Sequence, residues 1–82
     1  MGLKAVNKEE RRQEEVYNAL VAYTMRKGYV PTRREIGLAT NLSNWDVSNT
    51  LNALQARGLI RITPKTPRAI VLVGYSFVKR VD

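Results

Sequence analysis

Apolar residues recur at intervals of three and four along most of this chain, and the spacing predicts helices over residues 9–27, 33–40 and 43–57. The apolar face of the first consists of Val16, Leu20 and Tyr23, which Tyr17, Val21 and Thr24 can widen. The inward residues of the second are Ile36 and Ala39. In the third, the stripe is narrow and consists of Val47, Leu51 and Leu54. Because each stripe must be buried, the three helices are expected to pack together.

Capping signals bound each predicted helix. For the first helix, Asn7 followed by Glu10 marks the start, and Gly28 after two basic residues marks the end. Thr32 and Glu35 form a capping box for the second helix. Ser43 with Asp46 repeats this spacing for the third helix. The turn between the last two helices is Asn41-Leu42, and we expect Leu42 to be buried and to fix the interhelical angle.

Alternation of β-branched residues after Gly58 predicts a hairpin, with strands over 59–63 and 68–73 around the loop Pro64-Lys65-Thr66-Pro67. Tyr29-Val30, held extended by the following proline, predicts a short edge strand. The order helix, short strand, helix, helix, hairpin is that of a winged helix-turn-helix. The predicted fold class is therefore α+β, with three helices and a small antiparallel β-hairpin wing.

The chain of 82 residues is long enough for one domain, which we place at residues 9–73. Residues 1–8 show no sustained period and are predicted to be a flexible N-terminus. Residues 74–82 form a C-terminal tail with Tyr75, Phe77 and Val78, which are too apolar to stay solvated. This tail is expected to add a strand, to fold back on the first helix, or to make a dimer contact.

Basic residues outnumber acidic residues by 14 to 7, which gives a net charge of +7 and predicts a polyanionic partner. The excess is concentrated between Arg26 and Arg68, where eight Lys and Arg residues face only Glu35 and Asp46. Before Tyr17 the charges nearly cancel. The positive charge therefore surrounds the third helix.

Several functions are excluded by residue type. The chain has no cysteine and no histidine, so thiolate metal sites, Cys or His nucleophiles and His bases are absent. The acids of the first helix, at positions 9, 10, 14 and 15, are spaced for pairs along a helix rather than for a convergent catalytic pair. The longest strongly apolar run, 69–73, is too short to cross a bilayer. We therefore predict no enzyme activity, no cofactor, no metal and no membrane partner, and a cytoplasmic location.

The outer face of the third helix is unusual because its side chains form hydrogen bonds without formal charge. The candidate base-reading residues are Ser43, Trp45, Asp46, Ser48, Asn49 and Asn52. Asn matches the N6/N7 edge of adenine, and Ser can serve either kind of base. Trp45 can lie against a thymine methyl group or a sugar, or can contact a protein. For Asp46 the capping bond is the favoured role, and accepting from a cytosine amino group is the alternative. A plain solvated polar face remains open.

Cations flank this helix on both sides. The candidate phosphate and wing residues are Arg33, Arg34, Arg61, Lys65, Thr66 and Arg68. Each charged one could neutralise a phosphate and release counterions. For any single residue, a solvated surface charge is the alternative.

The stretch from Gly28 to Leu72 resembles the DNA-binding domain of the LexA repressor family. That family typically shows G-x-x-P-T-R-x-E-I, then a polar helix ending in L-x-x-L-x-x-x-G-h-I, then a wing with an Arg before an apolar strand. The matching segments here are residues 28–36, 51–60 and 68–70, and the resemblance spans roughly residues 10 to 73.

The resemblance implies a docking mode but not an operator sequence. In the family, base-reading side chains align with Ser43, Trp45, Asp46, Ser48 and Asn49, of which only Ser43 keeps the typical residue type. The family also carries a C-terminal self-cleaving Ser/Lys peptidase domain that dimerises it, and this chain stops about where the linker would begin. Self-cleavage is therefore not implied. The chain is either an excised domain or a small stand-alone regulator such as phages, plasmids and archaeal mobile elements encode.

The predicted function is sequence-specific binding of double-stranded DNA by a small repressor-like transcriptional regulator of a bacterial or archaeal cell or of its virus. The helix 43–57 enters the major groove, and the wing 63–68 lies on the backbone or in the minor groove. A lone module has few phosphate contacts, so a homodimer or a partner protein is expected on DNA. The alternatives are a winged-helix protein interaction module, anchored by Trp45 and residues 75–78, and a phage or plasmid replication-origin binding protein.

Overall fold

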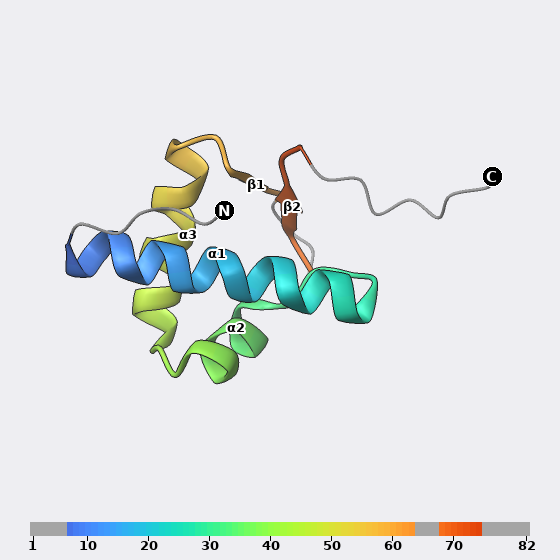
Figure 1. The fold of residues 1–82 in the computed structure, drawn as a ribbon, viewed down its shortest axis with the longest axis horizontal. Coiled ribbons are helices and arrows are strands. Elements are labelled where there is room, and N and C mark those ends of the chain that lie inside the picture. Colours follow the sequence, from blue (N-terminus) through green and yellow to red (C-terminus); the bar gives the residue numbers. More distant parts are fainter. Residues whose placement is uncertain (1–6, 64–67, 75–82) are drawn as a thin grey trace.

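The computed structural model describes residues 7–63 and 68–74, which form three helices and a two-stranded antiparallel sheet (Figure 1). The elements in chain order are α1 (Lys8–Lys27), α2 (Arg33–Thr40), α3 (Asn44–Ala56), β1 (Ile60–Ile62) and β2 (Ile70–Leu72). The long helix α1 crosses α3 and also packs on α2. This is the predicted α+β winged helix-turn-helix, with three helices and a hairpin.

Both predicted ends of α1 are confirmed, with a start one residue earlier than expected. The Asn7 side chain accepts a hydrogen bond from the backbone N–H of Glu10 at 2.8 Å, so the helix begins at Lys8. At the other end Gly28 has a φ of 85°, and its N–H donates to the Thr24 carbonyl oxygen at 2.8 Å. Glycine adopts this left-handed conformation without the penalty of a Cβ atom.

The turn between α2 and α3 is tight because a glycine lies beneath it. The capping box at Thr32 and Glu35 starts α2 as predicted. After α2, the backbone N–H of Leu42 donates to the Gly37 carbonyl oxygen at 3.2 Å. A Cβ atom on Gly37 would lie 3.0 Å from the Leu42 carbonyl oxygen, so any larger residue would push the turn away. Leu42 packs against the core but is only half-buried, less than we predicted.

The third helix, α3, occupies the centre of the core. Ser43 accepts a hydrogen bond from the backbone N–H of Asp46 at 3.1 Å and caps the helix as predicted. The predicted stripe of Val47, Leu51 and Leu54 is completely buried. It packs against both preceding helices, and its C-terminal end meets β1. The inner face of α3 therefore holds the helices and the wing in one cluster.

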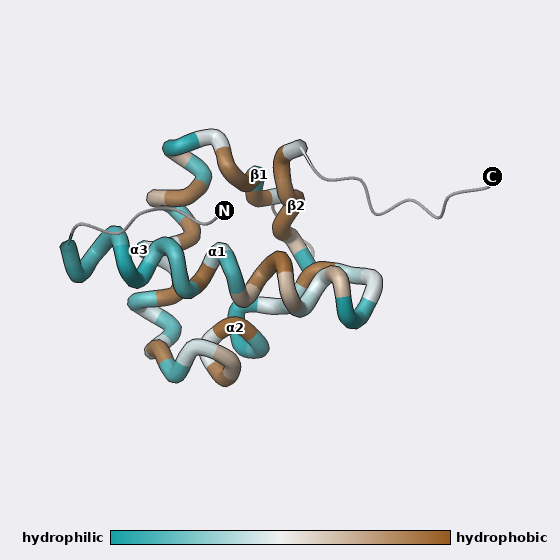
Figure 2. The backbone as a smooth tube through the Cα atoms, viewed as in Figure 1, coloured by the Kyte–Doolittle hydropathy of each residue, from teal (hydrophilic) through white to brown (hydrophobic). Residues whose placement is uncertain are grey.

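The core is small and almost entirely aliphatic. Among the residues that the structure describes, the buried hydrophobic ones are Val16, Leu20, Ile36, Val47, Leu51, Leu54, Ile60, Ile70 and Leu72. Figure 2 shows the hydrophobic colour on both strands, whereas the N-terminal end of α1 is hydrophilic. Ala39, predicted to face inward, is exposed, because Ile36 alone turns the short α2 toward the core.

The wing pairs Ile60 with Leu72 and Ile62 with Ile70. Each strand has three residues and is shorter than predicted. The backbone N–H groups of Thr63 and Val73 still donate to the carbonyl oxygens of Ala69 and Leu59, at 2.6 and 3.1 Å, so the pairing continues by one residue at each end. The edge strand predicted at Tyr29-Val30 is wrong, because the sheet has only β1 and β2 within the described residues. The Val30 carbonyl oxygen accepts a hydrogen bond from the Arg68 side chain at 2.9 Å instead of a ladder bond.

Some predictions concern residues 1–6, 64–67 and 75–82, which lie outside the described part of the chain. They include most of the N-terminal segment, the tip of the wing with Lys65 and Thr66, and nearly all of the C-terminal tail.

Replacement of Leu51 by alanine tests the importance of the α3 stripe. We expect the free energy of unfolding to fall by about 2 to 5 kcal/mol, because the change leaves a cavity in a completely buried site. A domain of 82 residues has a total stability of only about 4 to 12 kcal/mol. The neighbouring exposed change Asn52→Ala should alter stability by less than about 0.5 kcal/mol. Urea unfolding followed by circular dichroism measures both, and similar losses would contradict the packing.

Candidate nucleic-acid interface

The outer face of α3 presents the side chains that the sequence singled out. Trp45, Asn49 and Asn52 are exposed, and the indole of Trp45 is 74% exposed. Ser48 is half-buried beside them, and Ser43 is exposed at the cap. These residues share one surface because the opposite face of the helix is held in the core by Val47 and Leu51. A helix with one buried and one amide-bearing face can enter a groove without losing its packing.

Gln55, near the C-terminal end of α3, has a structural role. Its side-chain oxygen accepts a hydrogen bond from the backbone N–H of Ile62 at 2.7 Å. The bond joins the last turns of α3 to β1, so it fixes where the wing stands relative to the helix. Only the tertiary fold brings Ile62 to this position, and the spacing along the chain gave no signal for it.

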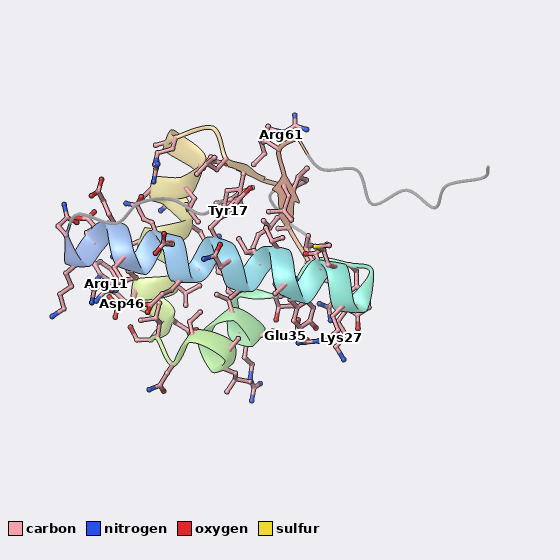
Figure 3. All side chains as sticks on the ribbon, in the orientation of Figure 1. Arg11, Tyr17, Lys27, Glu35, Asp46 and Arg61 are labelled. Atoms are coloured by element: carbon pink, nitrogen blue, oxygen red, sulfur yellow. The ribbon has the colours of Figure 1, made fainter. Side chains whose placement is uncertain are left out.

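Asp46 lies at the edge of the same face and is paired with an arginine of α1. The Nη1 atom of Arg12 donates to Oδ1 of Asp46 at 3.2 Å, and each side chain is about one-third exposed. Figure 3 shows Asp46 where the beginning of α3 passes α1. The capping role favoured for the Asp46 side chain is therefore wrong: Ser43 binds the backbone N–H of Asp46, while the Asp46 carboxylate binds Arg12. Sequence reasoning missed Arg12, whose partner is 34 positions away.

The groove beside this ion pair runs between α1 and the first half of α3. Its walls include Lys8, Glu9 and Arg12 from α1, and Trp45 and Asn49 from α3. The N-terminal half of α1 thus borders the same face that carries the amide side chains, and it brings both basic and acidic side chains there. No sequence pattern predicted this contact between the two helices.

Three of the predicted phosphate residues are exposed at the two ends of α3. Arg33 and Arg34 are exposed in the first turn of α2, which packs near the beginning of α3. Arg61 is exposed on β1, beyond the C-terminal end of α3, whereas α2 lies at the N-terminal end of α3 (Figure 3). The predicted contacts Lys65 and Thr66 lie outside the described residues.

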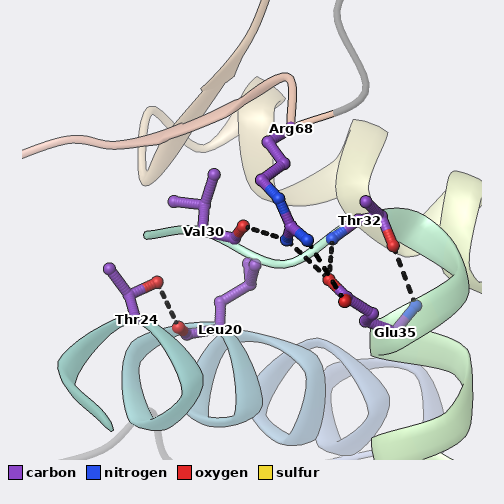
Figure 4. Close-up of polar contacts among 6 residues, drawn as sticks. All are labelled: Leu20, Thr24, Val30, Thr32, Glu35 and Arg68. Atoms are coloured by element: carbon purple, nitrogen blue, oxygen red, sulfur yellow. Dashed lines mark hydrogen bonds and ion pairs between the residues drawn. The ribbon is translucent and has the colours of Figure 1, made fainter. Parts of the chain in front are cut away.

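Arg68, the last predicted phosphate residue, also binds groups within the protein through its guanidinium (Figure 4). It donates to the two carboxylate oxygens of Glu35 at 2.7 and 3.3 Å and to the Val30 carbonyl oxygen at 2.9 Å. It also stacks over the Tyr29 ring, 4.5 Å from the centroid. A two-pronged arginine-carboxylate pair has a defined geometry, so Arg68 fixes the base of the wing against α2.

The arginine changes the acidity of its partner. Hydrogen bonds from Arg68, and then from the backbone N–H of Thr32, lower the pKa of Glu35 from 4.5 to about 2. The carboxylate therefore stays charged across the physiological range and holds both the cap of α2 and the wing.

The described residues offer few other kinds of site. In the ranges 7–63 and 68–74, no group of three or more Cys, His, Asp and Glu residues is arranged to hold a metal ion. None of the helices in these ranges is both long enough and apolar enough to span a bilayer.

The fold is a helix-turn-helix followed by a two-stranded wing, and its second helix exposes amide side chains between exposed arginines. These features are those of a winged-helix DNA-binding domain. Residues 7–69 match the model of the LexA DNA binding domain, and the chain belongs to this family. The LexA repressor of Exiguobacterium sibiricum is 44% identical over 69 residues, which are 83% of this chain and 34% of that protein. The LexA repressor of Staphylococcus aureus is 44% identical over 65 residues, which are 78% of this chain and 31% of that protein.

The chain spans about a third of the length of these relatives. The family model that it matches describes the DNA-binding domain, so the similarity points to a regulator and does not extend to a peptidase domain. The earlier resemblance to this family is confirmed.

The pair of Glu35 and Arg68 predicts how stability depends on pH. The folded-state pKa of Glu35, about 2, lies below its ordinary value of 4.5, so the contribution is complete above 4.5 and is lost as the pH falls toward 2. Urea midpoints should therefore fall more steeply over this window in the unchanged protein than in Glu35→Gln. Glutamine can still accept the capping bond from Thr32, so the variant isolates the charge. Parallel curves for the two proteins would contradict the assignment.

Proposed function

We propose that this chain is the sequence-specific double-stranded DNA-binding module of a transcriptional repressor. The observation that carries the proposal is the exposed face of α3, whose hydrogen-bonding side chains stand opposite a completely buried stripe. In this docking mode α3 enters the major groove, and the wing, residues 63–68, lies on the backbone or in the minor groove. Membership of the LexA DNA binding domain family supports DNA as the partner, and the name of its relatives supports repression.

The residues proposed to read bases are Ser43, Trp45, Asp46, Ser48, Asn49 and Asn52. Asn49 and Asn52 are one helical turn apart and exposed, so both amides can meet adenine edges in the groove. Trp45 offers an exposed apolar ring for a thymine methyl group or a sugar. Asp46 keeps acceptor capacity for a cytosine amino group, because a carboxylate has more lone pairs than its one bond to Arg12 uses.

The residues proposed to bind phosphates are Arg33, Arg34, Arg61, Lys65 and Thr66. They fix the position of α3 on the duplex, whereas the base contacts determine the sequence that is bound. We assign Arg68 to the wing's attachment rather than to a phosphate, because its guanidinium already binds Glu35 and Val30.

The double change Asn49→Ala and Asn52→Ala tests the assignment of the reading face. A preferred site is first selected from random duplex DNA. The double variant should then lose most of its preference for that site, because each bidentate contact contributes about 1 to 3 kcal/mol of discrimination. Binding to random DNA should stay within about two-fold, since that binding depends on phosphates. Competition between labelled site and random DNA measures both quantities.

The matched control is Asn18→Ala, which removes an exposed amide from α1. It should leave selectivity and affinity unchanged. Equal selectivity in the double variant and the unchanged protein would overturn the residue assignment. Absence of any selected site, or of salt-sensitive binding, would overturn the proposed function itself.

We further propose that two copies act together on a palindromic or tandem site. One module has few candidate phosphate contacts, and pairing two modules on half-sites about 10 base pairs apart raises affinity. The C-terminal tail is the proposed contact between them. Sedimentation of the full chain should show a dimer, whereas the chain ended at Gly74 should be monomeric. If both are monomers at high concentration, the tail has another role.

The proposal places the protein in the cytoplasm of a bacterial or archaeal cell, encoded by that cell, a virus or another mobile element. A second candidate function is a protein interaction module, and the exposure of Trp45 favours it. A partner that co-purifies, together with no salt-sensitive DNA binding, would support this second function.

A further inference from the structure

Both acids in the basic segment between Arg26 and Arg68 are neutralised by arginines that are distant in sequence. Glu35 binds Arg68, and Asp46 binds Arg12. The guanidinium and carboxylate atoms are 2.7 Å apart in the first pair and 3.2 Å apart in the second. Negative charge in this part of the chain is therefore matched by positive charge in the fold. In the Asp46 pair, the arginine comes from α1, outside the basic segment.

Asp46 occupies the part of α3 where an acid costs DNA affinity most. It lies in the first turn, between the exposed Trp45 and the exposed Asn49 in the groove that α1 borders. The N-terminal residues of a recognition helix are those that approach the bases, and phosphates line both sides of the groove that they enter. Water leaves such a surface on binding, so a lone carboxylate would repel the duplex more strongly there than it does in solution.

Arg12 is placed to cancel this repulsion. Its Nη1 atom is 3.2 Å from Oδ1 of Asp46, and both side chains are about one-third exposed. In the free protein such a pair adds little stability, because water screens it. Near a polyanion, however, the same pair is neutral whereas Asp46 alone carries a full negative charge. The arginine is held in position by α1, which packs against α3 through the core.

We propose that Arg12 is a positioning residue of the DNA-binding surface, which masks the charge of Asp46 so that the first turn of α3 can approach the duplex. The inference rests on the proposed function, since it assumes that this end of α3 meets DNA. It assigns to α1 a part in DNA binding that does not require Arg12 to touch a phosphate.

A double-mutant cycle tests the masking role. Affinities for random duplex DNA are measured at several salt concentrations for Arg12→Gln, Asp46→Asn, the double variant and the unchanged chain. Arg12→Gln should weaken binding roughly three- to five-fold at low salt, because it exposes the acid to the phosphates, and the loss should shrink as salt is raised. The double variant should bind about as tightly as the unchanged chain, because this position is neutral in both, whereas Asp46→Asn leaves Arg12 with an unmatched positive charge.

Arg11→Gln is the matched control, since it removes the same charge from an exposed, adjacent position of α1. It should weaken binding less than Arg12→Gln does. Thermal unfolding of every variant shows whether the fold is retained. Because Asp46→Asn removes the proposed repulsion without altering Arg12, comparison of it with the double variant isolates the contribution of Arg12 alone.

Two results would overturn the inference. If the double variant binds as weakly as Arg12→Gln, the loss comes from Arg12 itself and not from the unmasked charge of Asp46. If Arg12→Gln and Arg11→Gln bind equally well, Asp46 does not need masking. Both comparisons use random DNA, so they are independent of site selection. If no preferred site can be selected, the proposed sequence-specific function is wrong. The double-mutant cycle on random DNA would still show whether Arg12 masks Asp46.

Discussion

Burial of one stripe of α3 is the constraint on which the rest of the structure depends. Val47, Leu51 and Leu54 are completely inaccessible to water, and they contact the helices before them and the wing after them. Because an α-helix is rigid, burying this stripe also determines which side chains face outward. The surface proposed to read DNA is thus set by hydrophobic packing on the opposite side of the same helix.

Polar bonds between distant parts of the chain supplement the small core. Gln55 binds the backbone of β1, Arg57 donates to the buried Gln13 at 2.8 Å, and Arg68 binds α2. Each of these bonds crosses from one element to another, so it fixes an orientation that the aliphatic side chains alone would leave loose. The wing in particular has only three residue pairs of its own, and its position relative to α3 depends on Gln55 at one end and Arg68 at the other.

The arginines of this strongly basic protein have two different roles. Arg33, Arg34 and Arg61 are exposed on the elements beside α3, which suits contacts with phosphates. Arg12 and Arg68 instead bind the two acids of the basic region. A count of charges along the chain treats these arginines alike. Their surroundings show that some of the positive charge serves to neutralise acids of the protein itself.

The sequence by itself determined the elements, the order of the fold and the buried stripes, because these follow from local rules. Helical spacing, the caps at Asn7, Thr32 and Ser43, and the glycine at position 28 each act within a few residues. It also identified the family and the outward face of α3. The edge strand at Tyr29-Val30 was predicted by the same local rules and is wrong, because a strand needs a partner backbone and Val30 meets a guanidinium instead. The roles of Arg12, Gln55 and Arg68 were decided only by the tertiary structure, since their partners lie 34, 7 and 33 positions away and meet them only once the core has formed.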